Sequence, residues 1–127
     1  MDNMEIALIA AAVVAMLHVL SIAYVCLGGF LALRDPRWLV PHLAAVTWIV
    51  VGGALLAVCP LTALEKWLIV QAGETPYDGY FISHYLVGRV YPEAIADQMR
   101  DLAAVVILAS WATVVHRQTA RRPSVAA

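Results

Sequence analysis

Charged residues are scarce in this chain, because Asp, Glu, Lys and Arg together make up only 13% of its 127 residues. A nucleic-acid-binding protein would present a dense basic face, whereas the formal net charge here is -1. Cysteine is scarce too: Cys26 and Cys59 are the only two, which excludes a small domain held by several disulfides. The amino-terminal MDNME also lacks the positive charge of a secretory signal peptide, so we expect the first apolar run to be retained as a helix.

Apolar residues are abundant instead. They make up 63% of the chain, and the mean hydropathy is +0.81. A soluble protein of this size could not bury so much apolar surface, so lipid must cover part of it. We therefore expect residues 1–127 to form a single integral membrane domain.

Three apolar segments are candidates for crossing the bilayer. Residues 6–33 contain no formally charged side chain, and as a helix they would extend roughly 42 Å, against a hydrocarbon core of ~30 Å. Arg34 to Arg37 predicts a turn, because Pro36 cannot continue a helix. A second uncharged run, 38–58, would return antiparallel to the first, and a third span, 95–116, follows Pro92. The prediction is an all-α membrane protein with three transmembrane helices.

A shorter segment, 61–72, has apolar residues at helical spacing but also contains Glu65 and Lys66. Twelve residues are too few to cross a bilayer as a helix, so we expect a short interfacial or re-entrant helix. It belongs to a polar outer cap, which we define as residues 59–94.

Basic residues indicate the orientation, because Lys and Arg collect on the cytoplasmic side of membrane proteins. With three spans, the two basic groups fall on one side: Arg34 and Arg37, and Arg117, Arg121 and Arg122. The sequence thus predicts a multi-pass protein of the plasma membrane with its amino terminus outside and its carboxy terminus cytoplasmic. Residues 117–127 would form a short disordered basic tail at the inner leaflet.

Four histidines invite a haem or metal hypothesis, but depth argues against one shared site. His42 would lie ~6 Å above the inner interface and His18 ~22 Å above it. The structural interpretation of His18 is a neutral imidazole bonded across a helix interface, packed near Gly28 and Gly29; the functional interpretation is a ligand or proton-relay position. Gly52 and Gly53 would likewise let another helix pack closely against the predicted helix 38–58. For His42 and His116 the structural interpretation is preferred.

The string CPLTALE, from Cys59 to Glu65, allows two interpretations. Thr62 and Glu65 have the spacing of a capping box, in which each side chain bonds the other residue's backbone N–H. Alternatively, Cys59, Glu65 and His84 converge at the outer face and hold a metal such as copper or zinc. Depth also separates Cys26 from Cys59, so we expect no disulfide between them.

Two further polar groups complete the candidate outer site. Tyr77, Tyr80, Tyr85 and Tyr91 either form an aromatic belt at the lipid headgroups or line a pocket. Asp97, Arg100 and Asp101 share one face of the last helix. Since an unpaired charge near the membrane is costly, we expect partners for them among Glu65, Lys66, His84 and Arg89.

Several strings together resemble a known family. They are Leu17-His18 and Gly28-Gly29 in the first helix, then CPLTALE, GYFISHYL from Gly79 to Leu86, and Tyr91-Pro92. On these residues the chain resembles the bacterial membrane family catalogued as domain of unknown function 2784. The resemblance implies a fold and a topology but no activity.

Two functions remain open at this stage. The first is a non-enzymatic accessory or scaffold protein, packed in the bilayer as a homo-oligomer or within a larger membrane complex; no recognisable catalytic constellation is present. The second is a ligand-, metal- or quinone-binding redox protein with its site at the outer face, using Cys59, Glu65 and His84. The sequence identifies no cofactor.

Overall fold

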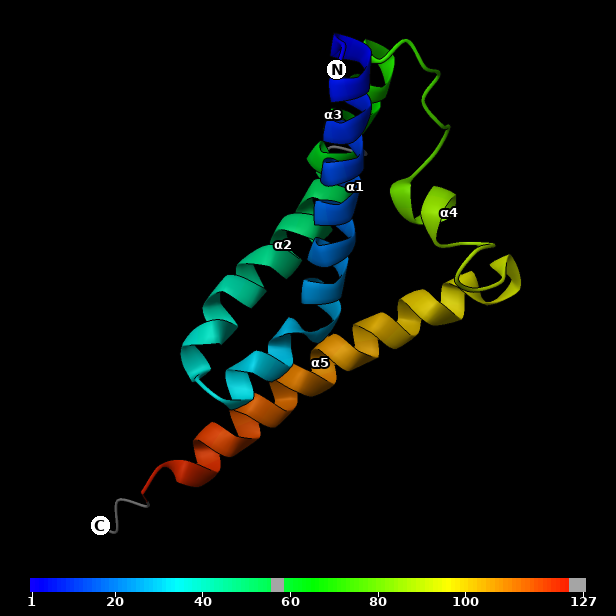
Figure 1. The fold of residues 1–127 in the computed structure, drawn as a ribbon. Helices are drawn as coiled ribbons and strands as arrows, with labels where there is room; N and C mark the ends of the chain where they lie inside the picture. The colour runs from blue at the N-terminus through cyan, green and yellow to red at the C-terminus, as the bar shows by residue number, and fades with distance from the viewer. Residues whose placement is uncertain (56–58, 124–127) are drawn as a thin grey trace.

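The structure is a computed structural model and describes residues 1–55 and 59–123. Over these residues the chain is helical apart from its turns and an isolated bridge between Val87 and Tyr91, which confirms the predicted all-α class. The elements follow in the order α1 (Asn3–Leu27), η1 (Gly28–Leu33), η2 (Pro36–Trp38), α2 (Leu39–Leu55), α3 (Pro60–Gln71), α4 (Phe81–Tyr85), η3 (Glu93–Ile95) and α5 (Ala96–Arg121) (Figure 1).

The first helix begins with a capping box between Asp2 and Glu5. The Glu5 N–H donates to the Asp2 side chain at 2.9 Å, and the Asp2 N–H donates to the Glu5 carboxylate at 3.2 Å. From Gly28 the helix tightens into the 3₁₀ turns of η1. The continuous helical stretch Asn3–Leu33 is long and apolar enough to cross a membrane, as the sequence predicted for residues 6–33.

The predicted turn after this stretch is also present. The Asp35 side chain accepts a hydrogen bond from the Arg37 N–H at 3.0 Å and caps η2. α2 then runs from this turn toward α3, inclined away from α1 (Figure 1). Of the predicted second span, 38–58, residues 39–55 are helical, and 56–58 lie outside the described residues. Among the described residues, the two helical stretches that meet the length and composition of a membrane span are Asn3–Leu33 and Glu93–Arg121.

The short helix α3 lies along the amino-terminal half of α1, where the two helices make extensive contact (Figure 1). The α1 side of this interface consists of residues spaced by four, three and four positions, which share one helix face: Ala7, Ala11, Val14 and His18, all buried. Thr62 and Glu65 are the buried residues of α3. Small alanine side chains on α1 let the two helices approach closely.

The predicted capping box at Thr62 and Glu65 is wrong. α3 begins at Pro60 with Cys59 as its N-cap and no side-chain cap hydrogen bond. Thr62 therefore lies inside the first turn, where it cannot serve as the cap. The Glu65 side chain instead lies in the interior of the protein.

The last helix, α5, crosses α1 and η1 at their lower end (Figure 1). Gly29 makes the crossing possible, because a Cβ atom there would lie 2.0 Å from Ser110 Oγ. The close approach predicted for Gly28 and Gly29 is thus present, whereas a Cβ at Gly52 would meet no atom of the described residues within 4 Å. The helix continues to Arg121, so the prediction of a disordered tail is wrong for residues 117–121. Alanine, arginine and glutamine are strong helix formers and extend it there.

Candidate functional site

The centre of the outer cap is the carboxylate of Glu65, which is only 1% exposed. A buried carboxylate without partners would be strongly disfavoured. Here the Tyr77 hydroxyl donates to Oε2 at 2.9 Å, and the Tyr85 hydroxyl donates to Oε1. Both oxygens are therefore engaged, and a carboxylate that only accepts matches two hydroxyl donors.

The segment after α3 folds back to deliver these two tyrosines. Gly73 and Gly79 adopt φ angles of 77° and 82°, a conformation that side chains other than glycine rarely adopt. Lys66 fixes the second of these turns, since its Nζ donates to the Gly79 carbonyl at 2.7 Å. The same ammonium lies 4.7 Å from the centre of the Tyr77 ring, within the range of a cation–π contact. Glu65 and Lys66 thus anchor the same turn from adjacent positions of α3.

The environment of Glu65 also shifts the acidity of its two partners. Burial, then the hydrogen bond to Glu65 and its negative charge, raise the pKa of Tyr85 to about 12. The same causes, in the same order, raise the pKa of Tyr77 further. Both hydroxyls therefore keep their protons and act as donors throughout the physiological range.

A continuous set of aromatic contacts connects the cap to α1. His84 stacks on Tyr77 with ring centroids 4.0 Å apart, and Tyr85 packs against Phe81 at 4.6 Å. Phe81, which is 2% exposed, stacks on His18 at 4.0 Å. The short helix α4 is therefore held on α1 and α3 by aromatic packing.

His18 is the polar residue of α1 that faces this cluster. It is 8% exposed, its Nε2 lies 3.8 Å from the Cys59 sulfur, and its Nδ1 is buried with no partner among the described residues. His18 and Cys59 also line a cleft of about 220 Å³ between α1, α2 and the start of α3. The remaining lining is mostly apolar and includes Val25, Trp48 and Ile49.

His42 forms a second buried polar group, at the other end of the protein. It is 0% exposed, and its Nδ1 accepts from the Trp111 indole N–H at 2.9 Å. Since an indole only donates, the proton of a neutral ring is on Nε2, which lies 2.8 Å from the Val25 carbonyl and donates to it. His42 of α2 thus links α1 to α5, which supports its structural interpretation.

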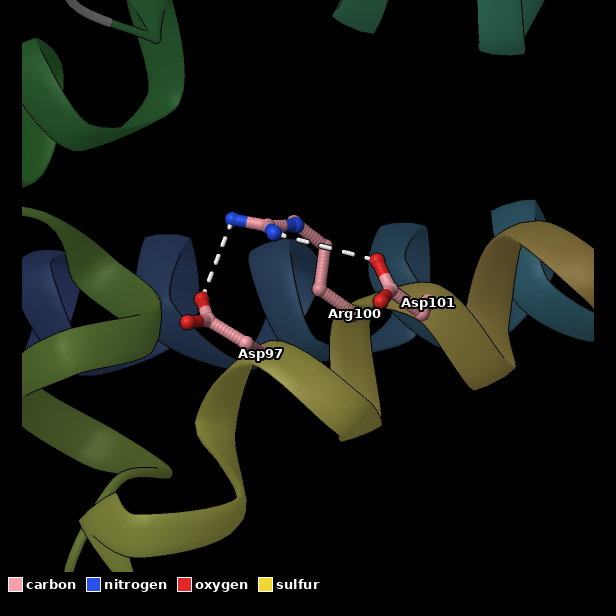
Figure 2. A network of polar contacts seen from close by, with 3 residues as sticks. All are labelled: Asp97, Arg100 and Asp101. Atoms are coloured by element: carbon pink, nitrogen blue, oxygen red, sulfur yellow. Dashed lines mark ion pairs between the residues drawn. The ribbon is translucent and has the colours of Figure 1, made fainter.

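The three charged residues near the start of α5 lie apart from the Glu65 cluster. Figure 2 shows Arg100 between two carboxylates, 3.3 Å from Asp97 and 3.7 Å from Asp101. Their side chains are 73%, 81% and 74% exposed, respectively. The expectation of partners among Glu65, Lys66, His84 and Arg89 is therefore wrong. Arg100 pairs with Asp97 three residues earlier on the same helix, and its flexible side chain also reaches the adjacent Asp101.

The other predicted site residues are distributed as follows. Cys59 lies beside His18, Glu65 lies between two tyrosines, and His84 stacks on Tyr77. Tyr80 is 66% exposed and Thr62 is buried against α1. In the described ranges, no group of three or more His, Cys, Asp or Glu side chains is placed to hold a metal ion, so the hypothesis that Cys59, Glu65 and His84 together hold a metal is wrong. Cys26 and Cys59 are both free, as expected.

The roles of Tyr77 and of the His18–Cys59 pair did not follow from the sequence. One pattern in the sequence could have indicated the His18–Cys59 pair. Ala7, Ala11, Val14 and His18 recur at helical spacing, which places His18 on the face of α1 that packs against another helix. No short-range pattern connects Tyr77 to Glu65, because the intervening turns depend on glycines at positive φ.

Residues 8–116 match the family described as Protein of Unknown function (DUF2784), and the chain belongs to this family. No curated protein and no solved structure matches the chain.

Proposed function

We propose that this member of the DUF2784 family is a three-span protein of the plasma membrane that acts as a non-enzymatic accessory or scaffold protein, assembled with further copies or with a larger membrane complex. α2 would supply the second span, between the helical stretches Asn3–Leu33 and Glu93–Arg121, which are long and apolar enough to cross a membrane. Its 17 residues include no formally charged side chain and extend about 26 Å, close to the ~30 Å of a hydrocarbon core.

The distribution of charge supports the orientation. The turn that carries Arg34 and Arg37 lies at the same end of the protein as the last residues of α5, opposite the amino terminus (Figure 1). Arg117 and Arg121 of α5 and Arg122 at its C-cap belong to that end too. Five arginines therefore mark a cytoplasmic side, and the amino terminus and the Glu65 cluster face outward.

One observation carries the scaffold proposal, namely the outward face of α2. Trp48, Val51 and Leu55 are 62%, 46% and 77% exposed and surround a groove of about 160 Å³ over Gly52. A Cβ at Gly52 would meet no described atom within 4 Å, so the glycine is not needed for packing within this part of the chain. Glycine on a lipid-facing helix permits close approach of another helix, which is how membrane helices associate.

The test compares two substitutions on this face. Gly52→Leu fills the groove, whereas Val50→Leu enlarges a residue that is 64% exposed and lies outside the groove. We expect native mass spectrometry from mild detergent to show an assembly that Gly52→Leu weakens about tenfold, the equivalent of roughly 1.4 kcal/mol. Val50→Leu should leave the assembly intact, and both variants should keep the helix content of the wild type by circular dichroism. A wild-type protein that is monomeric and has no partner would contradict the proposal.

The second candidate is a ligand-, metal- or quinone-binding redox protein with its site toward the outer face. The cleft lined by His18 and Cys59 favours it, because a mostly apolar pocket with a few polar groups is typical of small-molecule sites. Optical spectroscopy of the protein purified in mild detergent, followed by extraction and mass analysis of any bound organic molecule, tests this candidate. A quinone or coloured centre lost on His18→Phe substitution would favour it over the scaffold role.

A further inference from the structure

The two buried histidines differ in how their ring nitrogens are used. His42 is 0% exposed, and both of its nitrogens have strong partners, the Trp111 indole and the Val25 carbonyl. His18 is 8% exposed, yet among the described residues its Nδ1 has no partner and its Nε2 has only the Cys59 sulfur. Buried polar side chains are normally satisfied, so a histidine with this shortage requires an explanation other than structural stabilisation.

The atoms that His18 and Cys59 present to each other are both metal ligands. The Nε2–Sγ distance is 3.8 Å. A metal with bonds of about 2.3 Å to sulfur and about 2.0 Å to nitrogen bridges such a pair without large movements, since the two bonds reach up to about 4.3 Å in a line. Cys59 is half-buried and borders the cleft, so an ion can reach the pair from that side.

The small number of ligands selects which metal fits this pair. Zn²⁺ in structural protein sites is almost always held by four ligands. Among the described residues, no third His, Cys, Asp or Glu side chain joins His18 and Cys59 to complete such a set. A soft monovalent ion such as Cu(I) needs only two ligands, and the rest of the surroundings are mostly apolar, including Pro60, Leu61 and Phe81.

From these observations we propose that Cys59 Sγ and His18 Nε2 form a two-ligand site for a soft monovalent cation, Cu(I) or its analogue Ag(I). Soft thiolate ligands select Cu(I), and imidazole also suits copper. Binding replaces the thiol proton, which leaves to solvent, by the metal ion, and no electron is transferred. The site does not depend on the scaffold role of the α2 face.

The experiment uses the full-length protein with Cys26→Ser, so that Cys59 is the only thiol. Cu(I) binding is measured without oxygen in mild detergent against a coloured chelator. We expect one Cu(I) per chain, lost on Cys59→Ser and weakened at least about 100-fold by His18→Phe, because even second-shell losses cost 10–100-fold in affinity. His18→Phe keeps an aromatic ring against Phe81 while removing both nitrogens. His84→Phe makes the same change in the ring stacked on Tyr77, and should bind Cu(I) as the parent does.

Three results would overturn the proposal. One is an equal affinity of His18→Phe and His84→Phe for Cu(I), which would mean that the Cys59 thiol binds the ion without His18. Another is binding that survives Cys59→Ser, and a third is displacement of Cu(I) by equimolar Zn²⁺, which would show that the site is not selective for a soft ion with two ligands. If His18→Phe does not fold, X-ray absorption of the Cu(I)-loaded parent decides: one sulfur and one imidazole nitrogen around copper support the site, and sulfur alone refutes it.

Discussion

The hydroxyl of Tyr77 donates to Oε2 of Glu65 at 2.9 Å, and this contact ties the turn after α3 to the interior face of α3. The second oxygen of the same carboxylate receives the Tyr85 hydroxyl from α4. A single buried acid thus fixes two successive segments of the outer cap. Several measurable consequences for stability depend on it.

Removal of either hydroxyl should destabilise the cap. Tyr77→Phe and Tyr85→Phe each leave one oxygen of a buried carboxylate without its donor, which costs about 1–3 kcal/mol. Thermal unfolding in detergent measures this loss. Tyr80→Phe is the matched control, because Tyr80 is 66% exposed and the described hydroxyl donors to Glu65 are Tyr77 and Tyr85. Equal melting temperatures for Tyr77→Phe and Tyr80→Phe would show that the Glu65 contacts do not stabilise the fold.

The same hydrogen bonds predict how stability depends on alkaline pH. Burial and Glu65 raise the pKa of Tyr85 from 10.0 to about 12, so the fold favours the protonated hydroxyl. A pKa raised on folding gives a contribution that is complete below the unfolded value and is lost as pH rises through the folded value. Denaturant titrations should therefore show the Tyr85 contribution falling between pH 10 and about 12. The Tyr85→Phe variant should lack that part of the decline, and an identical pH profile would contradict the assignment.

Gly29 should tolerate no side chain. A Cβ there would lie 2.0 Å from Ser110 Oγ, and Ser110 is fully buried at the crossing of α5. Overpacking of this kind costs about 1–3 kcal/mol, so Gly29→Ala should lower the unfolding temperature. Gly52→Ala, at a helical position with open space in the described structure, should not lower the unfolding temperature, because alanine favours a helix more than glycine does. A neutral Gly29→Ala would mean that α5 does not cross η1 there.

The hydrogen bond from Trp111 to His42 predicts a third stability effect. Trp111→Phe leaves the buried Nδ1 of His42 without a donor, at a cost of about 1–3 kcal/mol. Trp38→Phe serves as the control because Trp38 is 50% exposed. Chemical unfolding followed by far-ultraviolet circular dichroism distinguishes the two variants. Equal stability of Trp111→Phe and Trp38→Phe would mean that the hydrogen bond between Trp111 and His42 does not stabilise the packing of α1, α2 and α5.

Much of the fold was predictable from the sequence, because uncharged runs and proline turns act locally. The stretch Asn3–Leu33 and the turn capped by Asp35 follow from the absence of charge before Arg34 and from Pro36. The heights of the histidines and cysteines in the membrane were estimated for helices perpendicular to the bilayer, however. They therefore did not predict that His18 lies beside Cys59. α2 is inclined to α1, which changes the height of every residue after it (Figure 1).

The candidate site was predictable only as a region. Cys59, Glu65, His84 and Tyr85 were all placed in the cap, but their partners depend on tertiary contacts that no spacing encodes. Glu65 is an example, since its spacing from Thr62 matched a capping box while burial directed the side chain to Tyr77 and Tyr85. For Arg100 the local pattern was the better guide, because its partners are the two aspartates on the same helix face and no partner from the cap was needed.

The sidedness of single cysteines tests the three-span account most directly. In a variant without Cys26 and Cys59, cysteines are introduced at Asn3, Asp78 and Thr119, all of which are exposed. A membrane-impermeant maleimide added to intact cells should label Asn3→Cys and Asp78→Cys, and should label Thr119→Cys only after the cells are permeabilised. If α2 does not cross, Asp78 and Asn3 lie on opposite sides. Labelling of Thr119→Cys but not Asp78→Cys in intact cells would therefore contradict the three-span account.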